Sequence, residues 1–152
     1  MSRAEKAKEY FLAGHACSQA VALAFADVMN QNEDDVKKMM LPFGGGLGRL
    51  RLTCGAVSGL AMVIGATCAG AENTPENKMN TYALIQELCA KFEKECGSLI
   101  CSQLLENMKV PVEVGGTAEP RTKEYYQKRS CADIVYCAAD IVENYLKEKE
   151  IL

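Results

Sequence analysis

Apolar residues recur along most of the chain at the three- and four-residue intervals typical of amphipathic helices. No segment shows the regular alternation of apolar and polar residues that predicts a strand. The pattern predicts helices, in order, at residues 3–13, 16–30, 33–41, about 53–67, 75–95, 98–108 and from about 122 or 130 to 149, with a break near Arg129. We therefore expect an all-α fold, a helical bundle of about six to seven helices in a single domain spanning residues 1–152.

Residues typical of helix ends support these boundaries. Gly14 ends the first helix, and Gly97 ends the long helix at residues 75–95. Thr74 is placed to cap that long helix, with Pro75 at its first position. Ser98 is the candidate cap of the helix that follows. The ends of the predicted helices thus agree with their apolar periodicity.

Residues 52–70 form an uncharged stretch about as long as a membrane span. The stretch is rich in Gly, Ala, Ser and Thr, is poor in Leu, Ile and Phe, and lacks an aromatic belt. We therefore expect the helix at about 53–67 to lie at the centre of the bundle rather than in a membrane. Gly55, Gly59 and Ala66 are predicted to face close helix neighbours.

Two connecting segments carry little regular structure. The sequence FGGGLGR (43–49) fails the tests for a P-loop and for a dinucleotide fingerprint, because no Lys-Ser/Thr follows it and no strand precedes it. It is either a tight connection between helices or a nest of N–H groups beside Cys54. Residues 109–121 look irregular, and the sequence VPVEV within them is a candidate short strand.

The composition excludes several classes of function. The 152 residues are 49% hydrophobic and 24% charged, with a net charge of −3, and the basic residues are dispersed along the chain. Neither a basic patch nor a base-stacking platform is indicated, so we expect no nucleic-acid partner. The N-terminal residues lack the pattern of a secretory signal, so we expect a cytoplasmic protein with no membrane span. Eight cysteines in that compartment indicate metal or redox chemistry rather than structural disulfides.

Four of the cysteines fall at predicted helix starts: Cys17, Cys54, Cys101 and Cys131. The free N–H groups and positive dipole of a helix N-terminus stabilise a thiolate, which is both the nucleophile and the metal ligand of cysteine chemistry. No CxxC pair occurs, so any site must combine distant segments. The other four are expected to be core or incidental residues: Cys68, Cys89, Cys96 and Cys137.

Two further residues have alternative interpretations. Arg49 either holds a Cys54 thiolate electrostatically or is a solvated charge near a turn. We expect the Cys54 thiol to be more acidic than a free cysteine and partly accessible. The single histidine, His15, is either an acid–base partner of Cys17 or an exposed residue at a helix start, and the second interpretation is favoured.

At these residues the sequence resembles the C-GCAxxG-C-C family of redox-active proteins. The matching stretches cover most of residues 14–141: GHACSQAVALAF, PFGGGLGR, CGAVSGLAMVIG, GSLICSQLL and CADIVYCAADI. The resemblance assigns the family cysteines to Cys17, Cys54, Cys101 and Cys131. It implies thiol redox or cluster chemistry, with an oxidoreductase or transporter partner, and names no substrate.

Three functional hypotheses follow. The first is a thiol-based oxidoreductase, in which the clustered thiolates, with Arg49, carry out thiol–disulfide exchange or electron transfer. The second is a metal-binding protein with an iron–sulfur cluster or zinc held by the same four cysteines. The third is a helical interaction module without catalysis.

Overall fold

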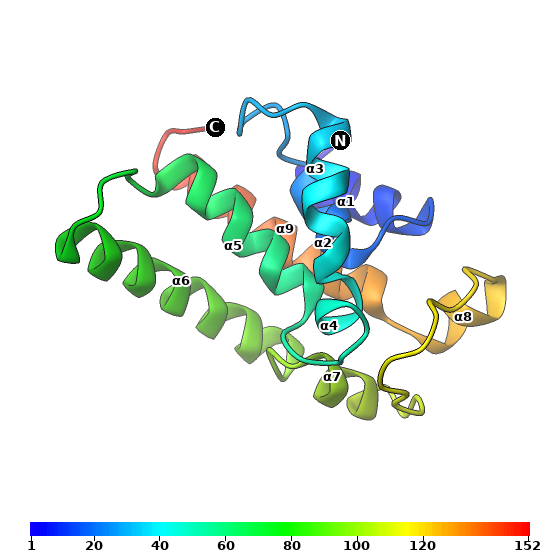
Figure 1. Cartoon of the computed structure of the whole chain (residues 1–152). Helices are drawn as coiled ribbons and strands as arrows, with labels where there is room; N and C mark the ends of the chain where they lie inside the picture. The colour runs from blue at the N-terminus through cyan, green and yellow to red at the C-terminus, as the bar shows by residue number, and fades with distance from the viewer.

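The computed structural model describes all 152 residues and consists of helices joined by loops, with no strand longer than an isolated bridge (Figure 1). The elements are, in order, α1 (Arg3–Leu12), α2 (Cys17–Leu23), α3 (Glu33–Met40), the 3₁₀ turn η1 (Leu41–Phe43), α4 (Gly44–Leu47), α5 (Gly55–Cys68), α6 (Pro75–Cys96), α7 (Cys101–Asn107), α8 (Lys123–Lys128) and α9 (Cys131–Glu148). The all-α prediction is confirmed. The two additional helices are the single turn α4 and α8, which is separated from the final helix at the predicted break.

Side-chain caps explain where several helices begin. Ser2 accepts a hydrogen bond from the Glu5 N–H, and the Glu5 carboxylate accepts one from the Ser2 N–H, which forms a capping box on α1. Thr74 caps α6 through the Asn77 N–H, and Gly97 ends that helix in the left-handed conformation. These local signals account for the agreement between predicted and observed boundaries.

Three predicted segments differ from the structure. The second helix ends at Leu23, because the hydrogen bonds of Phe25 and Ala26 tighten to the third preceding carbonyl and residues 24–30 form turns. The α7 helix begins at Cys101 rather than Ser98, whose hydroxyl instead accepts from the Ile100 N–H. Residues 109–121 contain no strand, so the VPVEV prediction is wrong.

Thirty buried residues form one contiguous core, built largely from α2, α5 and α9. The α1 helix packs on α9 and α2, and α6 lies along α5 and α9 (Figure 1). A methyl group added at Gly59 would lie 2.9 Å from the Ser18 carbonyl oxygen, so α2 and α5 approach closely there, as predicted. Ala66 is exposed, which contradicts its predicted contact, because it follows the last buried turn of α5.

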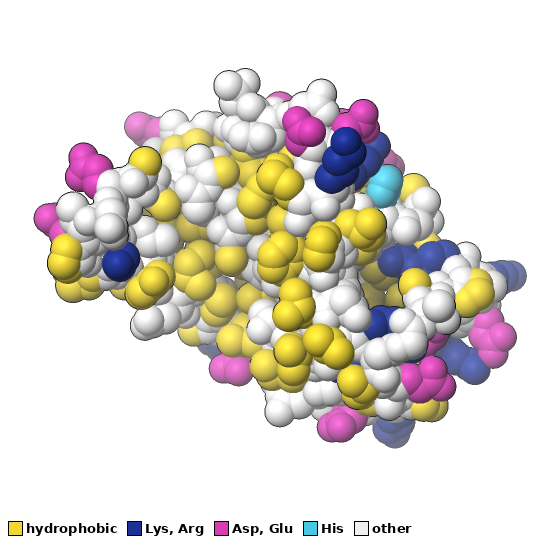
Figure 2. All heavy atoms as spheres, in the orientation of Figure 1, with side chains coloured by type: hydrophobic (Ala, Val, Ile, Leu, Met, Phe, Trp, Pro, Cys, Tyr) yellow, Lys and Arg dark blue, Asp and Glu magenta, His cyan; other side chains and the backbone are white.

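No helix combines the length and the apolar character that crossing a bilayer requires. Apolar side chains gather on the face shown in Figure 2, over α4 and the neighbouring ends of α5 and α7. The segment from η1 to the start of α5 contributes exposed apolar side chains: Leu41, Phe43, Leu47, Leu50 and Leu52. Lys and Arg side chains surround a hollow between α4 and α8 in the same view.

Candidate functional site

A short antiparallel bridge joins the starts of α5 and α7. Thr53 pairs with Ile100, and the residue after each of them donates to the opposite segment. The Cys54 N–H donates to the Leu99 carbonyl at 2.8 Å, and the Cys101 N–H donates to the Leu52 carbonyl at 2.6 Å. This bridge brings two helix N-termini together, each with a cysteine at its first or capping position.

Glycines allow the other segments to approach. A side chain at Gly55 would collide with the Cys17 sulfur, so the first turns of α2 and α5 are in contact. Gly46 has a φ of +72°, and a methyl group there would lie 2.6 Å from Cys101 Cβ. The glycine segment (residues 43–49) therefore folds tightly over the start of α7. Its close approach to Cys101 requires a residue without a side chain at position 46.

The four cysteines at helix starts line one cavity of about 290 Å³. Cys17, Cys101 and Cys131 are the first residues of α2, α7 and α9, and Cys54 is the N-cap of α5. A negative charge on Cys17 would raise the pKa of Cys54 and of Cys131, and one on Cys101 would raise the pKa of Cys17, so Cys17 lies near each of the other three. The structure therefore brings these four cysteines together, whereas their chemical roles stay a prediction.

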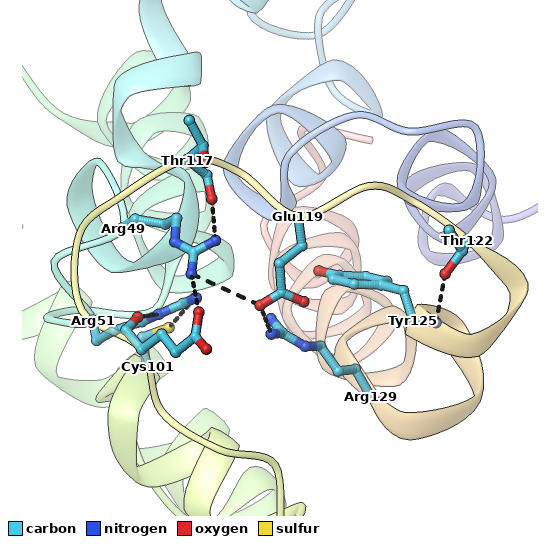
Figure 3. A network of polar contacts seen from close by, with 9 residues as sticks. Arg49, Arg51, Cys101, Thr117, Glu119, Thr122, Tyr125 and Arg129 are labelled. Carbon is cyan, nitrogen blue, oxygen red and sulfur yellow. Dashed lines mark hydrogen bonds and ion pairs between the residues drawn. The ribbon is translucent and has the colours of Figure 1, made fainter.

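Four arginines line the same cavity against a single carboxylate, that of Glu119: Arg49, Arg51, Arg121 and Arg129. Figure 3 shows Glu119 between two of these guanidinium groups. Its Oε1 accepts from Arg129 Nη2 at 2.6 Å and lies 3.8 Å from Arg49 Nη2. The cavity is therefore electropositive as well as rich in sulfur.

Residues 109–121 form a loop that covers one side of the cavity. The Gly115 N–H donates to the Arg49 carbonyl at 2.9 Å, and the Arg49 guanidinium donates to the Thr117 carbonyl (Figure 3). Arg51 Nε donates to the Glu113 carbonyl at 2.9 Å. Arg49 and Arg51 thus hold this loop in place.

Arg121 and Tyr125 form another wall. The Arg121 guanidinium lies 4.3 Å from the ring centre of Phe11 and 5.0 Å from that of Tyr125, and donates to the His15 carbonyl. Burial raises the pKa of the Tyr125 hydroxyl, and its proximity to Cys17 and Cys131 adds to this effect. The Tyr125 side chain therefore faces the sulfur cluster as a neutral phenol.

Burial dominates the acidity of three of the cavity thiols. Desolvation raises the pKa of Cys17, raises that of Cys131 to about 12, and raises that of Cys54 well above its ordinary value. The N–H groups of Ala56 and Val57 favour a Cys54 thiolate, but without a full capping hydrogen bond they do not overcome burial. Cys54 is only 6% exposed, so the expectation of an acidic, accessible Cys54 is wrong.

Cys101 has a different environment. It is half-buried, and Arg51 Nη1 lies 3.8 Å from its sulfur (Figure 3). Arg51 is itself 5% exposed, so its charge acts on the sulfur with little screening by water. Cys101 is therefore the cavity cysteine with a guanidinium directly beside its sulfur.

The structure gives Arg49 and His15 other contacts than the sequence predicts. Arg49 donates to the 109–121 loop and pairs with Glu113 and Glu119, and it is not among the charges that shift the pKa of Cys54. His15 packs edge-on against Tyr10 and does not line the cavity. Its pKa is lowered by burial and by nearby positive charge.

The family profile described as "Putative redox-active protein" (C_GCAxxG_C_C) matches residues 15–145, which is most of the chain and includes all four cavity cysteines. The chain belongs to the C_GCAxxG_C_C family. A relative from Archaeoglobus fulgidus, described as an uncharacterized protein, is 28% identical over 163 aligned residues that cover 99% of each chain. No solved structure matches.

Several residues of this cavity were not identified as site residues from the sequence. Arg51, Arg121, Arg129, Glu119 and Tyr125 all line it. A local signal existed for three of them, because cationic and aromatic residues cluster immediately before Cys131 in a segment that otherwise looks irregular. Their convergence on the cysteines depends on tertiary packing.

A metal ion does not fit the arrangement of donors in this C_GCAxxG_C_C protein. No three of its His, Cys, Asp and Glu side chains are grouped so that they could hold one. All eight cysteines are free thiols. The cavity therefore presents a group of thiols surrounded by arginines.

Proposed function

We propose that this C_GCAxxG_C_C protein is a thiol-based oxidoreductase that performs thiol–disulfide exchange in its arginine-lined cavity. The observation that carries the proposal is the convergence of four helix-start cysteines on one cavity, with Cys17 near the other three. The family description agrees with redox activity and names no reaction.

Cys101 is the proposed attacking residue. Its sulfur lies 3.8 Å from Arg51 Nη1, and a cation at that distance stabilises a thiolate over a thiol. Its position at the first residue of α7 adds the partial positive charge of a helix start. The raised pKa of the other three keeps them as neutral thiols near pH 7.

Cys17 is the proposed resolving residue, because it lies near Cys101 in the same cavity. The Cys101 thiolate attacks a substrate disulfide and forms a mixed disulfide, releasing one substrate thiolate. That thiolate takes the proton of the Cys17 thiol, and the Cys17 sulfur then attacks Cys101 Sγ. A Cys17–Cys101 disulfide forms and the second substrate thiolate leaves. Two protein sulfurs are oxidised and one substrate disulfide is reduced to two thiols.

The charge of the cavity favours anionic substrates. Four arginines face it against the Glu119 carboxylate, so a disulfide that carries carboxylates is attracted to it. A volume of about 290 Å³ admits a small molecule or the side chains of a protein segment. We expect an oxidoreductase to be the partner that regenerates the thiols.

The iron–sulfur or zinc alternative with the same four cysteines has less support. The donors are not grouped for a metal ion. Metal analysis of protein purified without oxygen tests this choice. Stoichiometric iron or zinc that is lost on replacing Cys17 would favour the metal alternative over disulfide exchange.

The exchange mechanism is tested by trapping the mixed disulfide. Reduced C17S protein is exposed to oxidised glutathione, and adducts are located by peptide mass spectrometry. The expected adduct is on Cys101, because the resolving thiol is missing, whereas the wild type should pass on to an internal disulfide. The C68S variant is the control, because Cys68 lies at the far end of α5 and outside the cavity.

Three outcomes decide the roles. C101S should form no adduct in the cavity. An adduct on Cys54 or Cys131 in C17S would contradict the assignment of Cys101, and the absence of any adduct in C17S would contradict the mechanism.

A further inference from the structure

A second pair of cysteines lies outside the cavity. Cys96 is the last residue of α6, and Cys137 lies in the second turn of α9, where α6 and α9 pack together. Both residues are half-buried, and both line the same groove. No local pattern in the sequence associates them, because they are 41 residues apart on different helices.

A carboxylate completes the group. The Cys137 thiol donates to Glu95 Oε2 at 3.4 Å. The same thiol interacts with the Cys96 sulfur, and this interaction lowers the pKa of Cys96 and raises that of Cys137. The arrangement thus contains a sulfur at which the thiolate is favoured, a thiol and a carboxylate beside that thiol.

The pair opens onto a largely polar groove of about 760 Å³. Charged side chains of both signs line the groove: Lys8, Glu95, Lys128, Arg129 and Asp133. Lys8 pairs with Asp133 at 3.0 Å, Lys128 with Glu124 at 2.7 Å and Arg129 with Glu119 at 2.6 Å, so each of these cations already has a carboxylate partner. The groove is large enough for a peptide-sized ligand.

We propose that Cys96, Cys137 and Glu95 form a second redox site, at which a low-molecular-weight disulfide that enters the groove is reduced. This proposal does not depend on the function proposed for the four-cysteine cavity.

The chemistry is a two-electron exchange. The Cys96 thiolate attacks the disulfide, forms a mixed disulfide and releases one small thiolate. Glu95 then takes the proton of the Cys137 thiol, and the resulting thiolate attacks Cys96 Sγ. A Cys96–Cys137 disulfide forms, the second small thiolate leaves, and the proton on Glu95 passes to it. Two sulfurs of the protein are oxidised and the two sulfurs of the small disulfide are reduced.

The second site is separate from the cavity. Cys131 and Cys137 are six residues apart on α9, which places them about 9 Å apart along the helix and about 120° apart around it. Leu104, Arg129 and Ile134 line both the cavity and the groove and so form the wall between them. The two cysteine groups therefore lie on opposite sides of this wall.

The test maps disulfides after exposure of the reduced full-length protein to oxidised glutathione. Free thiols are alkylated, and the protein is digested with chymotrypsin. Cleavage after Leu99 and Tyr136 separates Cys96 from Cys101 and Cys131 from Cys137, so a Cys96–Cys137 link is distinguished from a Cys101–Cys131 link. The expected result is a Cys96–Cys137 link in the wild type and in the C101S variant.

Matched variants test the individual roles. C137S should accumulate a glutathione adduct on Cys96, whereas C96S should leave Cys137 unmodified. In E95Q the glutathione adduct on Cys96 should be resolved by Cys137 several-fold more slowly than in the wild type, because the base beside Cys137 is missing. The proposal is overturned if Cys96 and Cys137 stay unlinked in the wild type, or if C137S carries no adduct on Cys96. Neither result bears on the function proposed for the four-cysteine cavity, because the cavity disulfides are mapped separately.

Discussion

At the scale of single residues, the environment of each sulfur decides its chemistry more than its place on a helix does. Cys17, Cys54 and Cys131 each begin or cap a helix, yet burial raises the pKa of all three. Cys101 occupies the same kind of position with a guanidinium 3.8 Å away. A helix start favours a thiolate by a modest amount, and desolvation outweighs it unless a full charge is near.

Removing the charge of Arg51 should slow the reaction of Cys101. In R51M the alkylation rate of Cys101 at pH 7 is expected to fall several-fold, because the cation beside the sulfur is lost. R51K keeps a charge and should retain part of the rate. R3M removes an arginine paired with Asp27 outside the cavity and should leave the rate unchanged. Equal rates in R51M and R51K would show that the charge of Arg51 does not act on Cys101.

The raised pKa of Cys131 predicts a loss of stability at alkaline pH. In the unfolded chain this thiol ionises near its ordinary value of 9.0, and in the folded protein only near about 12. Between these values the unfolded state has released a proton that the folded state retains, so stability falls as pH rises.

The comparison with C131S isolates this effect, because serine does not titrate in that range. Above pH 9 the free energy of unfolding of the wild type should fall relative to that of C131S, by at most about 1.4 kcal/mol per pH unit. Urea denaturation at pH 7, 9 and 10.5 measures it. A difference that stays constant over this range would contradict a buried, neutral Cys131.

At the scale of secondary structure, glycines set how closely the helices approach. The contact of α2 with α5 depends on Gly55 and Gly59, and it fixes the position of the Cys17 sulfur against the start of α5. Gly65, one and a half turns further along α5, has no atom within 4 Å of the position of a side chain. The same residue type thus has a packing role at one end of α5 and none at the other.

The substitutions G59A and G65A form a matched pair. At Gly59 the added methyl group would lie 2.9 Å from both the Ser18 carbonyl oxygen and Val21 Cβ, so overpacking should cost about 1–3 kcal/mol. At Gly65 the methyl group meets nothing, and alanine should stabilise the helix by about 0.5–1 kcal/mol. Thermal unfolding of the two variants measures both effects. An unchanged melting temperature for G59A would show that α2 and α5 are not in close contact.

At the scale of the whole molecule, the cavity is assembled by segments distant in sequence. The 109–121 loop is held against the glycine segment by Arg49 and Arg51, and Glu119 joins Arg49 to Arg129 at the start of α9. Figure 3 shows these contacts converging beside Cys101. The loop therefore covers one side of the cavity that contains the sulfurs.

Replacing Glu119 should open this side of the cavity. E119A leaves the Arg129 guanidinium, whose side chain is 6% exposed, without its carboxylate, and should cost about 1–2 kcal/mol and raise alkylation of Cys17 and Cys131 several-fold. E113A is the control, because that carboxylate is largely exposed and its pairing with Arg49 should contribute less than about 1 kcal/mol. Similar alkylation rates in both variants would mean that Glu119 does not hold the loop.

Local signals in the sequence predict the helices and the positions of four cysteines at their starts, because caps and apolar periodicity act over a few residues. The bridge between Thr53 and Ile100 was not predictable, since it joins segments 47 residues apart. Burial of Cys54 follows from packing, which reverses the expected direction of its pKa shift. The pairing of Cys96 with Cys137 likewise depends on how α6 lies against α9.

The central claim is that the cavity thiols form a redox couple in the folded protein. Wild-type protein is equilibrated in glutathione buffers of graded potential, quenched by alkylation and mapped with chymotrypsin. The account predicts that Cys17 and Cys101 are oxidised together, in one two-electron transition, while the protein stays folded by circular dichroism. The account is contradicted if the four cavity cysteines remain thiols at every potential at which the protein is folded.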